Sequence, residues 1–264
     1  MLREELTSVG ESVTGVVRWL GGMIVMLGRA LSRGPRLPLG FFDISYQIFQ
    51  LGIRSLPLAT MMSLFVGMIL AWQFGEALAD FDATNRLGYV TALALVRELV
   101  PTLLAVTVGT KMATGMTAEL GSMKVTEQID ALSALGADPI KKLVWPRIVG
   151  SAFAMPLLVA WGNVVAMLGG MFISEYVFDV SWEYFYTTYI MILEPIHYVM
   201  SQTKGLVFGA LAGLIGCYQG FSTGYGTEAV GKATTDTVIW VSVMILLADF
   251  ALTALFMPVG PGGG

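Results

Sequence analysis

Long stretches without a charged residue constrain this chain more than any other feature of its sequence. Residues 56–75, 148–173 and 205–221 contain no Asp, Glu, Lys or Arg. Each is close to the length of about 20 residues that an α-helix needs to cross the hydrocarbon core of a membrane. Charged residues make up only 13% of the chain, whereas soluble domains carry about 25%. The sequence therefore predicts an integral membrane protein.

Two more apolar stretches, residues 89–109 and 237–256, complete a predicted set of five transmembrane helices. Residues 13–32 are also apolar, but Arg18 and Arg29 interrupt them. This pattern favours a helix that lies in or dips into the membrane interface, although a tilted span is the alternative. The predicted domains are an N-terminal helix with its connector, a transmembrane domain and a Gly-rich tail, at residues 1–50, 51–257 and 258–264.

The longest polar interruption covers residues 109–147. Within it, apolar residues recur at the spacing of one helix face, at Val125, Ile129, Leu132 and Leu135. Gly136 follows the last of them, where a helix end favours a residue that tolerates positive φ. The sequence therefore predicts a short amphipathic helix with an apolar stripe that it cannot bury alone. Periodicity does not decide whether lipid headgroups or a protein partner cover this stripe.

A second short helix is predicted directly after the first. Asp138 and Pro139 have the order of an N-cap and a first-turn proline, which are typical of a helix start. We expect Pro146 to end this second helix.

The same segment resembles a known family. Residues 117–149, TAELGSMKVTEQIDALSALGADPIKKLVWPRIV, are similar to the signature of the MlaE-type permeases. These are the membrane subunits of ABC transporters that work with MCE-domain lipid-binding proteins. Residues 204–221 and 226–239, KGLVFGALAGLIGCYQGF and GTEAVGKATTDTVI, resemble the C-terminal signature of that family. With the ALVRELVP stretch around Arg97, the similarity extends over about residues 51–256.

In that family the segment from Glu127 to Leu135 is a cytoplasmic coupling helix, which docks into a groove on the ATPase. The resemblance therefore implies a protein partner for the apolar stripe. It implies an ATPase-coupling role for Glu127, Gln128, Ile129, Asp130, Leu132, Leu135 and Asp138. It also implies a homodimer, a lipid cavity between the two copies, an extracytoplasmic MCE-domain partner, and phospholipid or a similar hydrophobic lipid as cargo. ATP and Mg²⁺ would be bound by the separate ATPase.

The distribution of basic residues indicates an orientation. Ten Lys and Arg lie in residues 29–54, 111–147 and 222–236, but only two lie in residues 76–88 and 174–204. Because cytoplasmic loops carry an excess of Lys and Arg, we assign the first set to the cytoplasm. This predicts a cytoplasmic N-terminus, a periplasmic C-terminus and a cytoplasmic coupling helix. The resemblance implies the inner membrane of a bacterium.

Three ionisable residues, Arg97, Glu98 and Asp249, fall inside predicted spans. A charged side chain at the bilayer centre costs about 2.5–3.5 kcal/mol, so these residues must face protein or water. They could line a polar part of a translocation path, or form ion pairs between helices without touching substrate. Candidate partners for Asp249 are Arg97, Arg18 or a hydroxyl group. A proton path through the same residues would instead indicate an ion-coupled secondary carrier.

Gly205, Gly209 and Gly213 form a GxxxGxxxG ridge. Small residues at this spacing let helix backbones approach closely, either within one subunit or across a dimer.

A stripe at helical spacing joins the end of the first span to the following loop, and such a stripe is most often core packing. The resemblance implies instead that it lines a lipid pocket, with one glutamine as its polar member: Leu70, Gln73, Phe74, Ala77 and Phe81.

Residues 226–233, GTEAVGKA, nearly match the phosphate-binding loop GxxxxGK[ST], but Ala233 replaces the hydroxyl that binds Mg²⁺. We interpret this as a chance match and predict no nucleotide site. One cysteine and one histidine predict no metal cluster. The sequence thus predicts a non-enzymatic permease subunit that binds no nucleic acid. A secondary carrier or a non-transporting membrane scaffold are the alternatives.

Overall fold

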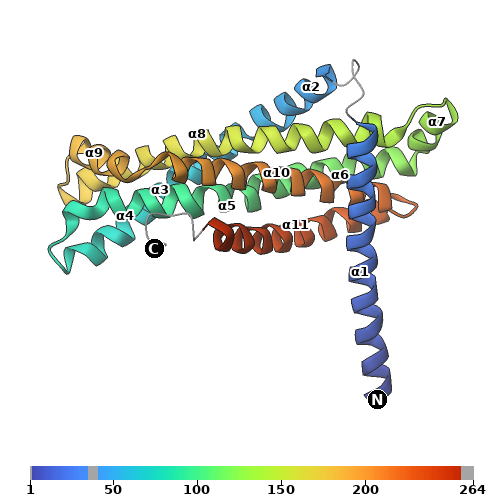
Figure 1. Cartoon of the computed structure of the whole chain (residues 1–264), viewed down its shortest axis with the longest axis horizontal. Coiled ribbons are helices and arrows are strands. Elements are labelled where there is room, and N and C mark those ends of the chain that lie inside the picture. Colours follow the sequence, from blue (N-terminus) through green and yellow to red (C-terminus); the bar gives the residue numbers. More distant parts are fainter. Residues whose placement is uncertain (1, 35–40, 257–264) are drawn as a thin grey trace.

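The computed structural model describes residues 2–34 and 41–256, with side chains from residue 14 onward. Within these ranges every regular element is a helix, which confirms the all-α membrane fold class. Long helices run side by side in one bundle (Figure 1). Its members are α3 (Leu56–Ala79), α4 (Leu87–Ala94), α5 (Val100–Leu104), α6 (Thr110–Val125), α8 (Trp145–Phe178), α10 (Pro195–Ser222) and α11 (Thr227–Phe256).

Three further helices lie toward the two ends of the bundle (Figure 1). They are α2 (Phe41–Gly52), α7 (Gln128–Ala134) and α9 (Trp182–Ile192). Figure 1 shows α7 at one end together with the turn between α10 and α11, and α9 at the other end beside α4. α2 continues into α3 through the turn Ile53–Ser55 but diverges from the bundle axis.

α8 and α10 form the centre of the bundle. α8 packs against α3 and α10, α10 also packs against α6, and α6 packs against α11. α3 and α11 lie at the outside and keep many large apolar side chains exposed. Such surfaces need lipid or another protein chain to cover them.

The N-terminal helix α1 (Leu2–Arg33) runs across the bundle near the end that holds α7 (Figure 1). Trp19 stacks on Trp240 of α11 with 4.2 Å between ring centroids, and its edge meets Tyr218 of α10 at 6.0 Å. Six described helical stretches are long and apolar enough to cross a membrane, and Thr14–Arg33 is the one beyond the five predicted. α1 lies crosswise to the other helices (Figure 1). This direction favours the interfacial placement of α1 over a sixth span, and we propose that placement.

Glycine allows the closest helix contacts in the bundle. A Cβ atom added to Gly209 would overlap the backbone carbonyl oxygen of Ser151 in α8. A Cβ at Gly213 would lie 3.0 Å from Cα of Ile148, and a Cβ at Gly205 would lie 3.2 Å from Cα of Pro156. The GxxxGxxxG ridge therefore joins α10 to α8 within one chain.

Two widened π-helical turns interrupt the helical stretch Thr84–Val125. One covers Leu95–Leu99 and the other covers Ala105–Gly109. Turns of this kind insert one extra residue and occur often at functional sites. The first contains Arg97 and Glu98, two of the predicted intramembrane charges.

The polar segment contains α7, as the periodicity predicts. Gly136 has φ +78° and Asp138 Oδ1 accepts a hydrogen bond from the Ile140 N–H at 3.0 Å, so both predicted signals are confirmed. The prediction that Pro146 ends a second short helix is wrong. A π-helical turn at Ile140–Val144 leads directly into α8, and Pro146 lies in the first turn of α8, where proline is tolerated.

Candidate functional site

A buried lysine gathers acidic side chains inside the bundle. Lys204 of α10 is only 2% exposed, and its Nζ lies 2.5 Å from Glu98 Oε2 and 2.8 Å from Asp249 Oδ1. Nζ also donates a hydrogen bond to Thr253 Oγ1 at 2.8 Å. Glu98, Lys204, Asp249 and Thr253 are called the Lys204 cluster below. The cluster joins the π-helical turn Leu95–Leu99 to α10 and α11.

The charged side chains of this cluster stabilise one another, because each acid is paired with the same lysine. One ammonium faces two carboxylates, so removing Lys204 would leave both acids without a cation in an apolar bundle. Thr253 bridges the group, because its hydroxyl lies 3.3 Å from both carboxylate oxygens of Glu98. Asp249 Oδ1 and Lys204 Nζ form an ion pair, but the angles between them do not meet the geometry of a hydrogen bond.

The cluster is open on one side. The Glu98 side chain is 40% exposed and the Asp249 side chain is 18% exposed, while Lys204 is covered. The acid in the π-helical turn is therefore the member that a molecule outside this chain can reach. This arrangement can bind a cationic or hydrogen-bonding group at the surface of the bundle.

Arg97 does not join the cluster. Its side chain is half-buried and makes no hydrogen bond or ion pair with another described residue. Arg97 is therefore not the partner of Asp249, and neither is Arg18, because Lys204 occupies that position. The structure thus brings together Glu98 and Asp249 from the predicted intramembrane set.

The predicted coupling residues divide into buried and exposed groups. Ile129 is buried and Leu132 packs on the core of the same chain, so the bundle itself covers most of the apolar stripe. Leu135 is 83% exposed at the end of α7. The exposed polar residues around it are Glu127, Gln128 and Asp130. A protein partner would therefore meet Leu135 and these polar groups.

Asp138 ties the segment after α7 to α1. Its Oδ2 accepts a hydrogen bond from Arg33 Nη1 at 2.9 Å. Burial works against ionisation of Asp138, but hydrogen bonds from Arg33 and from the backbone of Ile140 and Lys141 lower the pKa of Asp138 below its usual value. Asp138 is therefore ionised at neutral pH, and it joins α1 to the start of the helix that becomes α8.

The predicted lipid-pocket stripe also divides. Leu70 and Phe74 are half-buried and pack on the core cluster. Gln73 and Ala77 are exposed on α3, and Phe81 is exposed in the turn that follows. Within one chain these residues do not line a single pocket, so a shared pocket would need a second surface opposite α3.

A family model described as Permease MlaE matches residues 44–255. The match covers the bundle from α2 to α11, including α7 and the Lys204 cluster. The chain belongs to the MlaE permease family. Membership confirms the resemblance that the signature segments indicate.

Relatives of this MlaE-family permease match over most of its length. A probable ABC transporter permease protein of Rickettsia bellii is 34% identical over 98% of this chain and 100% of its own length. The intermembrane phospholipid transport system permease protein MlaE of Haemophilus influenzae is 30% identical over 98% of this chain and 100% of its own length. The protein TRIGALACTOSYLDIACYLGLYCEROL 1, chloroplastic, of Arabidopsis thaliana is 36% identical over 90% of this chain and 68% of its own length.

Lys204, the central residue of the Lys204 cluster, was not identified from the sequence. The predicted span begins at residue 205, so Lys204 is counted among the residues of the preceding loop segment, 174–204. α10 in fact starts at Pro195, so Lys204 lies within the helix. Pro195 itself was the available signal, since proline is common in the first turn of a helix.

Proposed function

We propose that this chain is the permease subunit of an ATP-driven ABC transporter that moves phospholipid or a similar hydrophobic lipid. The observation that carries the proposal is α7, which lies at the end of a membrane bundle with Leu135 exposed among polar residues. Because the exposed residues of α7 around Leu135 are mostly polar, this surface favours a protein partner over lipid. The name of the Haemophilus influenzae relative, a phospholipid transport permease, supports lipid as the cargo.

The remaining parts of the proposal follow the family. A separate cytoplasmic ATPase would bind ATP and Mg²⁺, and an MCE-domain protein would exchange lipid with the permease outside the inner membrane. Two copies of the chain would form a homodimer, and the exposed apolar faces of α3 and α11 are available to cover each other. The N-terminus and α7 would lie in the cytoplasm, and the C-terminus in the periplasm.

The coupling role of α7 is tested by Leu135→Arg. Leu135 lies outside the core, so the variant is expected to fold and to insert normally. Burying an unpaired charge in the interface should weaken ATPase binding by about 2 kcal/mol, or about 30-fold. The measurement is the amount of ATPase that co-purifies with tagged permease, together with lipid-stimulated ATP hydrolysis.

Leu135→Met is the matched control, because it keeps an apolar side chain of similar volume. It should retain ATPase binding. Normal ATPase binding by Leu135→Arg would contradict the coupling assignment and favour a membrane surface for α7.

A further inference from the structure

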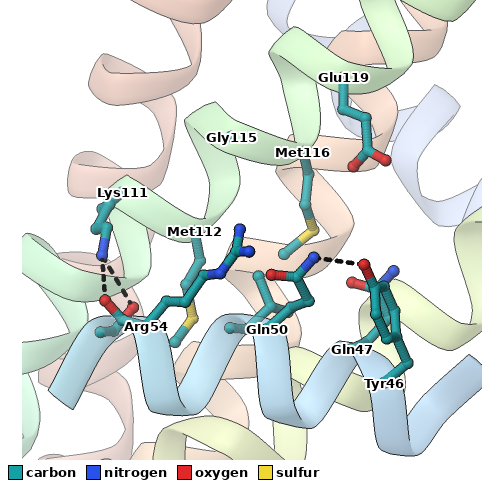
Figure 2. Close-up of a pocket in the computed structure, with 11 residues that line it drawn as sticks. Tyr46, Gln47, Gln50, Arg54, Lys111, Met112, Gly115, Met116 and Glu119 are labelled. Atoms are coloured by element: carbon teal, nitrogen blue, oxygen red, sulfur yellow. Dashed lines mark hydrogen bonds between the residues drawn. The ribbon is translucent and has the colours of Figure 1, made fainter.

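A second polar site lies apart from the Lys204 cluster. A cavity of about 660 Å³ opens between α2, the turn Ile53–Ser55 and α6 (Figure 2). This volume lies within the range of about 300–1,000 Å³ that is common for small-molecule sites. Lys111, which lines the cavity, follows Glu98 by 13 residues on the same helical stretch. At 1.5 Å per residue the cavity and the cluster are about 20 Å apart.

Two basic side chains line this cavity. The Arg54 side chain makes no hydrogen bond or ion pair with another described residue, so all of its N–H donors are free. Lys111 Nζ donates to the Arg54 carbonyl oxygen at 3.0 Å and to Ser55 Oγ at 3.3 Å (Figure 2). Because an ammonium has three donors, one remains for a ligand.

The single carboxylate in the lining does not neutralise these cations. Glu119 Oε1 lies 2.9 Å from Nη2 of Arg147, whose side chain is almost completely buried. The negative charge of Glu119 is therefore matched by a cation outside the lining. Arg54 and Lys111 leave the cavity with an excess of positive charge.

The rest of the lining is suited to an amphiphilic molecule. Gln47 and Gln50 supply amide groups, and the Gln50 amide donates to the Tyr46 hydroxyl at 2.6 Å. Met112 and Met116 line the α6 side of the cavity (Figure 2). Methionine adapts its shape to flexible apolar groups, so these side chains suit the glycerol and the first carbons of acyl chains.

We propose that this cavity binds the phosphate of a glycerophospholipid headgroup, through Arg54 and Lys111. A guanidinium matches phosphate oxygens with paired hydrogen bonds, and an ammonium adds a point charge. The cavity lies at the start of α3 and α6, on the side that the basic residues assign to the cytoplasm. The role of the lipid as cargo rests on the proposed function, but its binding here does not.

The binding test uses purified permease in vesicles of phosphatidylethanolamine and phosphatidylglycerol with a photoactivatable phosphatidylglycerol. Irradiation should attach this lipid to peptides of α2 or α6. Arg54→Gln and Lys111→Gln should each reduce labelling about tenfold, because each removes a charge-assisted hydrogen bond to phosphate. Lys232→Gln removes an exposed cation on α11 and should leave labelling unchanged.

Gly115→Leu tests the cavity without altering charge. Gly115 lines the cavity, and a Cβ atom there meets no other atom within 4 Å. Leucine should therefore fill the space, improve the helix propensity of α6 and abolish labelling. Thermal stability of each variant shows that it is folded.

The outcomes distinguish the sources of phosphate. Labelling that depends on Arg54 and Lys111 identifies a lipid headgroup. Stabilisation of the wild type by glycerol 3-phosphate or inorganic phosphate, without lipid labelling at α2 or α6, identifies a soluble phosphate. The proposal is overturned if the wild type shows neither lipid labelling at α2 or α6 nor stabilisation by phosphate. It is also overturned if Lys232→Gln reduces labelling as much as Arg54→Gln and Lys111→Gln do. Transport is assayed separately, so headgroup binding without transport would refute the proposed function alone.

Discussion

Lys204→Met is expected to destabilise the bundle by about 3 kcal/mol. The change leaves Asp249, whose side chain is only 18% exposed, without its cation, and an uncompensated charge of this kind is costly. Glu98 is 40% exposed, so solvent compensates part of its loss. The expected measurement is a large fall in the midpoint of thermal unfolding in mild detergent, together with a lower yield from the membrane.

A triple variant separates folding from transport. Glu98→Gln and Asp249→Asn remove the two acids, so adding them to Lys204→Met should restore most of the lost stability. If the cluster takes part in lipid movement, the stable triple variant should still fail to transport lipid. Full transport by the triple variant would make the cluster a structural element only. Wild-type stability of the single variant would show that Lys204 is not the cation of this site.

Gly209→Leu is expected to disrupt the packing of α10 on α8 by about 3 kcal/mol or more. The new side chain would overlap a backbone carbonyl, which cannot move aside as a flexible side chain can. Unfolding in detergent and protease sensitivity of the two helices report this loss.

Gly231→Leu in α11 is the matched control for that variant. A Cβ at Gly231 meets nothing within 4 Å, and leucine favours a helix more than glycine does, so stability should be unchanged or higher. If Gly209→Leu gave a stable monomer and lost only a dimer, the ridge would act between two chains instead of within one.

The charge pattern and the residues that begin or end helices were enough to predict much of the fold. Uncharged stretches predicted the spans, because only their length and polarity matter for crossing a bilayer. Gly136 predicted the end of α7, because few other residues adopt its positive φ. Pro146 did not end a helix as predicted, because it follows a π-helical turn and lies in the first turn of α8, where proline is tolerated.

The candidate site was harder to predict from sequence. Glu98 and Asp249 were conspicuous as charges inside spans, but their shared partner depends on how three helices pack. Burial of Ile129 and Leu132 likewise depends on the bundle that α7 rests against. The cavity between α2 and α6 has no sequence signature, because its residues come from two helices with separate patterns.

The helical stretch from Ile140 to Phe178, which contains one π-helical turn and Pro156, connects the α7 end of the bundle with the opposite end (Figure 1). Its 39 residues span about 58 Å, enough to reach from the segment that follows α7 to the opposite end of the bundle. A tilt of about 5° at its α7 end would displace its far end by about 5 Å, since the arm is this long. Arg33 and Asp138 fasten α1 beside the pivot. Any displacement of the α7 end of this stretch would therefore also displace its far end.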